Sequence, residues 1–510
     1  MDYVLGCDIG SQGVKVVLVS AEGRLAGEAG APYAIEYPYP TWAEQPAGRW
    51  IEALKQSIAR LIHETGVSPA QIKALGLDAQ VDGLVPVDVA GKPVRSAIIW
   101  MDRRAVSQVE TVQRACSPQQ VFRISGLNLD PYHVAPKIMW FKENQPELYE
   151  KSRYFLLPGS YVAYYLTGEM GVDYSNASSM LLLDVASKEW SDELCEVFQI
   201  PKDRLPPVYP ANRILGTLTG TAAGELGLLP ETRVTVGCGD EHAACLGAGV
   251  IVPGLVCDIA GTAEPVAAAS ARLYFDETGL VETHCHADPD LWLLENPGFV
   301  SGANYRWFRD QFGGSEVSAA LERNVNPYEL LNSLAEKVPP GSDGLIMLPC
   351  LMGAVTPTWN SAARGTFLGF TLTHTREHYV RAVLEASAYA LRDITDQMQH
   401  MGLELREIRA VGGGARSPLW RQIKADVTGL PVVKMETVET TALGAALLAL
   451  DGAGMVGSLA QAVQAAVKTV ETREPNPVSQ ARYQDYYQVY RKAYFALLPV
   501  FEFAAHIHKV

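Results

Sequence analysis

The chain has 510 residues, with 42 Lys and Arg against 57 Asp and Glu, which gives a formal net charge of −15. This length is enough for two α/β lobes of about 250 residues each. The acidic balance argues against nucleic acid or an anionic membrane as a partner. The 8 cysteines include no CxxC pair, and no apolar run is long enough for a signal peptide or a membrane span. We therefore expect a cytoplasmic protein with reduced thiols.

Strand-like and helix-like segments alternate along the chain. A β-rich stretch at 3–7 begins it, and a stretch with helical periodicity follows at 49–63. This alternation is typical of an α/β fold. Pro253-Gly254 follows a helix of small residues and divides the chain nearly in half. We predict two domains, residues 1–250 and 251–510, the second ending in a Tyr-rich helical segment.

The two halves begin with similar sequences. Residues 5–20 read LGCDIGSQGVKVVLVS and residues 255–270 read LVCDIAGTAEPVAAAS, each with the strand, small-residue turn and strand of a β-hairpin. An offset of 250 aligns the two Cys-Asp-Ile triplets, whereas an offset of 251 aligns Gly10-Ser11 with Gly261-Thr262. We favour the second alignment, because a turn glycine followed by a hydroxyl group can contact phosphate.

Three glycine-containing turns are candidates for phosphate binding. The first runs from Asp8 to Gly13, where glycines let a phosphate approach the backbone N–H groups and Asp8 suits a hydrated Mg²⁺. Gly261-Thr262 is the second turn, and Gly412 to Ser417, between a strand and a helix, is the third. Each alone also fits an ordinary turn, and it is their number that favours nucleotide binding.

Gly237 to His242 join a predicted strand to a predicted helix. The third glycine of a dinucleotide fingerprint is absent, since position 242 is His, and no GxxxxGK[ST] motif occurs. What remains is an acidic pair, Asp240 and Glu241, at the edge of a sheet, where catalytic carboxylates are often found. An Asp that only caps the helix is the alternative.

Two histidine patterns are similar to metal sites. His374 to His378 fit H-x-x-E-H, but Thr375 has the position of an N-cap, so the two imidazoles should not share a helix face. In His284-Cys285-His286 the side chains alternate as in a strand, which leaves Cys285 on the opposite side. We expect structural roles for both patterns, with a zinc hydrolase built on His374 and His378 as an alternative.

Several further stretches occur in a fixed order along the chain. They are DIGSQGVK (8–15), TWAEQP (41–46), AIIWMDRR (97–104), APKIMW (135–140), YLTGE (165–169), LLLDVASKEWS (181–191), GCGDEHAACLGAG (237–249), GTFLGFTLTH (365–374), AVLEASAYALRD (382–393) and VGGGARSPLWRQIKADVTGLPV (411–432). Together they resemble the FGGY family of carbohydrate kinases, most closely its xylulokinase branch. The resemblance implies an α/β fold of two RNase H-like lobes, the actin-like ATPase or sugar kinase architecture. Each lobe would hold a five-stranded sheet, with an interlobar active-site cleft for ATP and sugar.

The resemblance also implies roles for individual residues. Asp240 is the expected catalytic base on the sugar hydroxyl, and Asp8 is expected near the phosphates, as a ligand of Mg²⁺ through water. The expected ATP contacts are Gly10, Ser11, Gln12, Lys15, Gly261, Thr262, Gly413, Gly414, Ala415 and Ser417. The expected substrate contacts are Gln80, Val81, Asp82, Asp102, Arg103, Asp240 and Glu241.

The expected substrate pocket departs from the xylulokinase pattern. Xylulokinases usually have Gln-Met-His-Gly where this chain has Gln80-Val81-Asp82-Gly83, and Asn where it has Glu241. An ionised Asp accepts hydrogen bonds and cannot donate one to a ketose oxygen, whereas polyol kinases of the family carry an acid here. Repulsion among Asp82, Asp240 and Glu241 should raise the pKa of at least one of them.

The predicted function is ATP-dependent phosphorylation of a small sugar. Our first choice is a ketopentose such as xylulose, giving the sugar 5-phosphate and ADP. The alternatives are a polyol kinase acting on glycerol, a tetritol or a pentitol, and a non-sugar actin-like ATPase that acts through protein contacts. ATP and Mg²⁺ are the expected cofactors, a small molecule is the expected partner, and a homodimer is a possible assembly.

Overall fold

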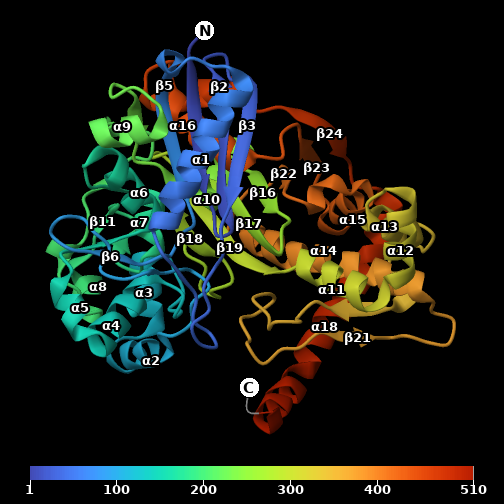
Figure 1. Cartoon of the computed structure of the whole chain (residues 1–510). Coiled ribbons are helices and arrows are strands. Elements are labelled where there is room, and N and C mark those ends of the chain that lie inside the picture. Colours follow the sequence, from blue (N-terminus) through green and yellow to red (C-terminus); the bar gives the residue numbers. More distant parts are fainter. Residues whose placement is uncertain (509–510) are drawn as a thin grey trace.

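Two mixed β-sheets, one from each half of the sequence, form the framework of the protein (Figure 1). The structure is a computed structural model and describes residues 1–508. The N-terminal sheet has the strand order β13-β14-β5-β1-β2-β3, with β15 also paired to β5. Its strands are β1 (Tyr3–Ile9), β2 (Gly13–Ser20), β3 (Leu25–Pro32), β5 (Ile72–Ala79), β13 (Ile214–Thr217), β14 (Arg233–Thr235) and β15 (Cys238–Gly239).

The C-terminal sheet has the strand order β18-β19-β17-β16-β22-β23-β24. Its strands are β16 (Leu255–Ile259), β17 (Ala263–Ser270), β18 (Glu282–Cys285), β19 (Trp292–Val300), β22 (Glu407–Val411), β23 (Val432–Met435) and β24 (Thr469–Arg473). Two-stranded pairs outside the sheets are formed by β4 (Glu44–Gln45), β6 (Val85–Val87), β7 (Ala97–Ile98), β8 (Tyr154–Leu156), β9 (Val172–Asp173), β10 (Leu183–Asp184), β11 (Glu189–Trp190), β12 (Val208–Tyr209), β20 (Ile346–Leu348) and β21 (Thr366–Leu368).

The two sheets share one topology. In the first, β1, β2 and β3 form an antiparallel meander, and β5 and β14 continue from β1 in parallel. In the second, β16, β17 and β19 form the meander, and β22 and β23 continue from β16 in parallel. This five-strand correspondence confirms the predicted pair of RNase H-like lobes. β13, β15, β18 and β24 are additions to the shared five.

Helices surround both sheets. α1 packs on β2 and β3, while α14 and α15 contact the C-terminal sheet. Among residues 1–508, no helix is both long and hydrophobic enough to cross a membrane. The helices are α1 (Gly48–Thr65), α2 (Val106–Ala115), α3 (Pro118–Ser125), α4 (Val134–Asn144), α5 (Pro146–Lys151), α6 (Pro158–Thr167), α7 (Tyr174–Ser179), α8 (Asp192–Val197), α9 (Gly220–Leu226), α10 (Asp240–Gly247), α11 (Gly302–Phe312), α12 (Gly314–Arg323), α13 (Pro327–Ala335), α14 (Arg376–His400), α15 (Pro418–Thr428), α16 (Thr440–Gly452), α17 (Leu459–Ala466) and α18 (Pro477–His508).

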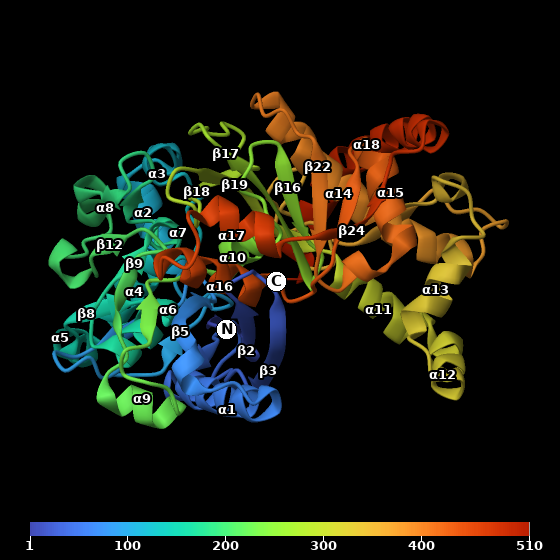
Figure 2. The same cartoon turned by 90° about the horizontal axis from the view of Figure 1, so that it is seen from above.

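Helices α10 and α16 lie between the two lobes and pack closely against each other (Figure 2). A Cβ atom at Gly247 would lie 1.8 Å from the Thr440 carbonyl oxygen, and one at Gly444 would lie 2.0 Å from that of Ala243. Glycine at these positions therefore allows the backbones to touch. α16 comes from the second half of the sequence but packs on β1 and β5 of the N-terminal sheet. The contact between the lobes thus fixes the end of β15, where α10 begins.

The hairpins β1–β2 and β16–β17 fit both alignments of the two halves, because their first strands match at one offset and their second strands at the other. Their first strands correspond at an offset of 250, because Asp8 and Asp258 are each the next-to-last residue of the strand. Their second strands correspond at 251, because Asp8 pairs with Lys15 whereas Asp258 pairs with Val266. The second hairpin therefore holds one more residue between these pairs than the first.

Candidate active site

Three carboxyl groups meet where the strands of the N-terminal sheet end. Asp8 of β1 lies in register with Asp78 of the parallel strand β5, and Asp78 pairs in turn with Cys238 of β15. Asp240 follows two residues later as the first residue of α10, whose N-cap is Gly239. The structure thus brings the predicted Asp8 and Asp240 together with Asp78, which the sequence analysis missed. Its signal was an Asp in a hydrophobic strand, just ahead of Gln80.

Burial raises the pKa of all three groups, and repulsion by neighbouring carboxylates adds to it for Asp78 and Asp240. Burial, followed by the charges of Glu241 and Asp8, holds the pKa of Asp240 well above its ordinary value, as expected for this acid cluster. Burial also raises the pKa of Asp8 to about 6. The pKa of Asp78 is raised by burial and by the charges of Asp8 and Asp240. Neither oxygen of Asp78 has a hydrogen-bond partner among the described residues, whereas Asp240 Oδ1 accepts the Glu241 N–H at 3.0 Å.

The β1–β2 turn presents backbone donors beside Asp8. Gly10 closes the turn by donating its N–H to the Gly13 carbonyl oxygen at 3.1 Å. Within residues 1–508, no protein acceptor lies within hydrogen-bonding distance of the Ser11 and Gln12 N–H groups. An anion next to this turn would therefore meet donors that the fold leaves unused.

Side-chain contacts connect this turn to the predicted substrate residues. Ser11 Oγ accepts a hydrogen bond from Trp100 Nε1 at 2.8 Å and donates to Gln80 Oε1 at 3.4 Å. On the other side of the turn, Lys15 lies opposite Asp8 and forms an ion pair with Glu439 at 2.6 Å. Glu439 is the residue before α16, so the turn also contacts the second half of the chain.

Asp82 is held at the edge of the N-terminal lobe by two basic side chains. His133 Nδ1 lies 3.1 Å from Asp82 Oδ1, and Lys137 donates to the Asp82 carbonyl oxygen at 2.6 Å. Burial lowers the pKa of His133, but the carboxylates of Asp82 and other acids outweigh burial and raise it overall. Val81 points toward Gly239, where an added Cβ would lie 2.6 Å from its Cγ1. The structure thus brings Gln80, Val81 and Asp82 to the strand end that carries Asp240.

Strands β18 and β19 of the C-terminal sheet bring additional acids to this site. Glu282 Oε1 accepts hydrogen bonds from both nitrogens of Asn128, at 2.8 and 2.9 Å, and its Oε2 accepts from Tyr132 at 3.4 Å. Burial, followed by the neighbouring Glu295, raises the pKa of Glu241. Sequence reasoning missed Glu282, Glu295 and Tyr132, because their approach depends on how the lobes pack.

Asp102 and Arg103 make contacts of different kinds. Asp102 accepts hydrogen bonds from the Ala43 N–H at 2.6 Å and from the guanidinium of Arg104 at 2.7 and 2.9 Å, so protein donors occupy both of its oxygens. Arg103 forms an ion pair with Asp130 at 2.8 Å and lies over the ring of Tyr132. Asp102 therefore holds its own loop in place, while Arg103 lies beside Tyr132, which contacts Glu282.

The two glycine turns of the C-terminal lobe lie against each other. Gly414 donates its N–H to the Ala260 carbonyl oxygen at 3.0 Å, and Gly302, the first residue of α11, donates to Gly261 at 3.1 Å. Gly412 has φ of 80° and a Cβ there would lie 2.8 Å from the Ala260 oxygen, so this approach requires glycine. Three segments far apart in sequence therefore form one surface.

The end of this glycine loop starts α15. Ser417 is the N-cap and accepts from the Trp420 N–H at 3.2 Å, while Trp420 Nε1 donates to Ser387 Oγ at 2.7 Å. Ala415 is buried, whereas no atom lies within 4 Å of a Cβ added at Gly413. Gly413 therefore has open space beside it, next to the capped helix.

The predicted residues thus form two groups. One gathers Asp8, the β1–β2 turn and the substrate residues around Asp240, and the other gathers the turns at Gly261 and Gly412. Hydrogen bonds connect members within each group. Among the described residues, no hydrogen bond or ion pair runs directly between the two groups, so their joint action belongs to the proposal below.

The H-x-x-E-H stretch begins α14 as expected, with Thr375 as N-cap and His374 before the helix. Because His374 precedes the helix, the two imidazoles do not share a helix face, although their ring centroids lie 5.1 Å apart. Each Nδ1 accepts a backbone N–H of its own turn, from Thr371 and Thr375. These rings are therefore used in capping.

The duplicated lobes, each with a glycine turn after its first strand, define an α/β protein of the actin-like ATPase fold class. Residues 3–247 match the N-terminal domain of the FGGY family of carbohydrate kinases, and residues 259–452 match its C-terminal domain. The chain belongs to the FGGY family of carbohydrate kinases, which are phosphotransferases.

Individual relatives agree with this assignment. A xylulose kinase from Staphylococcus epidermidis is 30% identical over 497 residues, covering 97% of this chain and 96% of the relative. A glycerol kinase from Thermococcus onnurineus is 31% identical over 453 residues, 88% of each chain. The crystal structure of a xylulose kinase from Rhodospirillum rubrum superposes with a TM-score of 0.90 at 28% identity, covering 98% of this chain and 100% of that one.

Proposed function

We propose that the protein transfers the terminal phosphoryl group of ATP to a ketopentose such as xylulose, giving the sugar 5-phosphate and ADP. The observation that carries this proposal is the convergence of Asp8, Asp78 and Asp240 at one end of the N-terminal sheet, next to Gln80 and Asp82. The xylulose kinases that resemble this chain over nearly its whole length support the choice of sugar. Membership of a carbohydrate kinase family argues against a non-sugar ATPase.

Asp240 is the proposed general base. Its carboxylate orients the attacking hydroxyl group and accepts the proton as the new bond to phosphorus forms. Because burial, Glu241 and Asp8 raise its pKa, ionised Asp240 binds a proton more strongly than an exposed Asp does. The transition state of phosphoryl transfer is loose, so correct alignment of the hydroxyl contributes more than base strength.

The remaining predicted residues would hold the nucleotide. Asp8, Asp78 and Asp240 offer the carboxylate oxygens that Mg²⁺ prefers, and Mg²⁺ bound there with ATP supplies positive charge for the phosphates. The turns at Ser11 and Gly261 donate backbone N–H groups, and the loop from Gly412 to Ser417 holds adenosine. In this arrangement the domain of residues 1–250 binds the sugar and that of residues 251–510 binds ATP, in the cytoplasm.

A polyol is the second candidate substrate, and Asp82 is the observation that favours it. Asp82, anchored by His133, accepts hydrogen bonds from hydroxyl groups and cannot donate to a ketose carbonyl. Glu241, Glu282 and Glu295 add acceptors nearby. The similarity to a glycerol kinase agrees with this reading. Replacing Asp82 with His should raise the ratio of ketopentose to polyol turnover if Asp82 selects hydroxyl groups, and an unchanged ratio would remove it from substrate choice.

The direct test is an ADP-release assay with ATP, Mg²⁺ and a panel of ketopentoses, tetritols, pentitols and glycerol. The proposal expects the highest kcat/KM with a ketopentose and a product phosphorylated at carbon 5, identified by ³¹P NMR. Higher kcat/KM with a polyol would establish the second candidate. Absence of acceptor-dependent ADP release across the panel would overturn both.

A further inference from the structure

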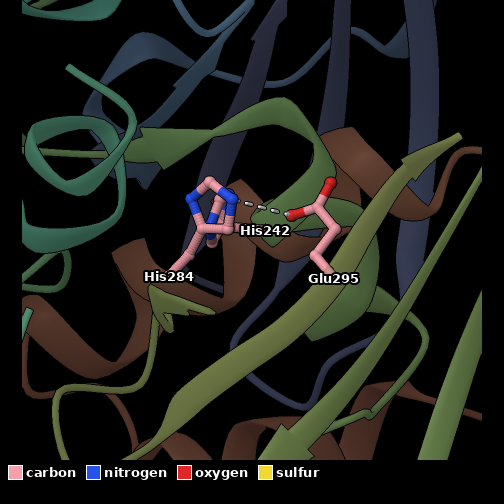
Figure 3. Close-up of side chains that lie close together, drawn as sticks. All are labelled: His242, His284 and Glu295. Carbon is pink, nitrogen blue, oxygen red and sulfur yellow. Dashed lines mark ion pairs between the residues drawn. The ribbon is translucent and has the colours of Figure 1, made fainter. Parts of the chain in front are cut away.

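His242, His284 and Glu295 form a buried cluster (Figure 3). His242 comes from the first turn of α10, His284 from β18 and Glu295 from β19. One nitrogen or oxygen atom of each residue lies within 4.8 Å of those of the other two. His284 Nε2 is 3.8 Å from Glu295 Oε2, and the two imidazole centroids are 5.5 Å apart. The cluster therefore joins α10 of the first half to the sheet of the second.

The cluster leaves polar atoms without partners. Both ring nitrogens of His242, Nδ1 of His284 and Oε2 of Glu295 are buried and make no hydrogen bond within residues 1–508. The three residues are only 1%, 6% and 2% exposed. Each unsatisfied buried group costs about 1–3 kcal/mol. Native proteins rarely keep so many such groups together, so a ligand that binds all three is the simplest way to satisfy them.

The local charges favour a cation over an anion or a neutral ligand. The only ion-pair partner of Glu295 in the described chain is His284. Glu282 approaches the same imidazole at 4.0 Å, and Glu241 lies beside Glu295. Two neutral imidazoles and a carboxylate are a ligand set for zinc and similar transition metals, whereas Mg²⁺ and Ca²⁺ prefer oxygen alone.

We propose that His242, His284 and Glu295 bind one divalent transition-metal ion of the zinc class, separate from any Mg²⁺ that accompanies ATP. Ligand bonds of about 2.0–2.2 Å require the three side chains to close inward by roughly an ångström. The bound ion would fix the first turn of α10, and with it Asp240, against β18 and β19. The inference goes beyond the kinase function and does not depend on which sugar is phosphorylated.

The test measures metal content and zinc binding of the full-length protein. Because the ligands are buried, chelator-stripped protein is unfolded and refolded with or without ZnCl₂, and bound zinc is counted by mass spectrometry. We expect one tightly bound zinc ion per chain, a higher Tm for the zinc-loaded protein, and X-ray absorption showing two imidazoles in the first shell. Less than a tenth of an ion per chain, with no shift in Tm, would overturn the proposal.

Variants locate the bound ion. His284→Gln and the nearly isosteric Glu295→Gln should each lower zinc affinity at least about 100-fold. His374→Gln changes the half-buried pair His374 and His378, which could take up zinc adventitiously, and should leave the tight site intact. If zinc is lost in His374→Gln but kept in Glu295→Gln, the assignment is wrong. The X-ray absorption of the unmodified protein decides the matter if a variant fails to fold.

Discussion

Asp8 and Asp258 occupy the same position in the two lobes but have opposite surroundings. Each is the next-to-last residue of the first strand of its sheet, followed by Ile and a small-residue turn. Asp258 accepts a hydrogen bond from Lys424 at 2.5 Å, and Lys424 also pairs with Glu264 at 3.0 Å. Asp8 has two further carboxyl groups as neighbours instead. The two lobes thus have equivalent aspartates, of which Asp258 forms a buried ion pair and Asp8 remains available to bind a ligand.

The difference shows how one topology separates stability from function. The Lys424 group makes Asp258 a fixed part of the C-terminal core, beneath the turn at Gly261. Lys15, opposite Asp8, is exposed and paired with Glu439, and within residues 1–508 neither Asp8 nor Asp78 forms an ion pair, so that end of the N-terminal lobe stores unfavourable charge. Buried carboxyl groups with perturbed pKa values are typical of functional sites, where a bound ligand can neutralise their charge. The comparison therefore predicts that changes at the two aspartates affect different measurements.

Asp8→Asn should give the largest effect, on activity. We expect kcat to fall by about 10³-fold, because the proposed alignment of MgATP is lost, while Tm stays the same or rises as repulsion with Asp78 is relieved. Steady-state kinetics and thermal unfolding measure the two quantities. Asp2→Asn, at the exposed residue just before the same strand, is the control and should change neither. Normal kcat in Asp8→Asn would contradict the role given to this strand end.

Lys424→Met should give the next largest effect, on stability. It leaves the buried Asp258 and Glu264 without their cation, which should lower the free energy of unfolding by about 3–5 kcal/mol. Urea unfolding measures this change. Lys202→Met removes an exposed pair with Asp192 and should cost less than about 1 kcal/mol. Equal losses in the two variants would show that burial of the pair does not matter.

Asp173→Asn should change how stability depends on pH. Asp173 caps α7, and burial raises its pKa from 3.8 to about 6. A raised folded pKa means that the folded protein resists ionisation, so this carboxyl group destabilises the fold as pH rises from 4 to above 6. Asn keeps one of the two capping oxygens without the charge, and its stability relative to Asp should rise by about 2 kcal/mol between pH 4.5 and 7.5. Urea unfolding at pH 4.5 and 7.5 tests this, and a constant gap would refute it.

Gly413→Ala should give the smallest effect, on nucleotide binding. No protein atom lies within 4 Å of the added Cβ, so Tm should not fall. If adenosine lies along this loop, the methyl group should raise KM for ATP about fivefold and leave KM for the sugar unchanged. Gly314→Ala, equally unhindered at the start of α12, is the matched control. Unchanged kinetics in Gly413→Ala would place the nucleotide elsewhere.

The sequence predicted the elements that depend on local patterns. The hairpins, the duplicated lobes and the acids at strand ends follow from alternation, turn glycines and motif order, and the structure confirms the hairpins and the lobes. Asp78 was missed because a single acid in a buried strand carries no motif. It becomes visible only when β5 is placed beside β1.

Features that depend on the packing of the lobes could not be predicted in this way. Glu282, His284 and Glu295 reach the first lobe from β18 and β19, more than 40 residues beyond Asp240 in sequence, and no local period indicates which lobe they face. Likewise, helices α10 and α16 can pack closely only because Gly247 and Gly444 lack a Cβ atom, and nothing in the sequence marks these two glycines as contact positions. The neighbours of these five residues are set by tertiary contacts between the lobes, which no local sequence pattern predicts.

Asp240→Asn tests the central claim most directly. The account holds that the carboxyl groups of the N-terminal lobe and the glycine turns of the C-terminal lobe act in one phosphoryl transfer. Sugar-dependent ADP release should therefore fall at least about 10³-fold in Asp240→Asn, while calorimetry shows ATP binding within about threefold of the unmodified protein. Sugar-dependent ADP release at the normal rate in this variant would contradict the account.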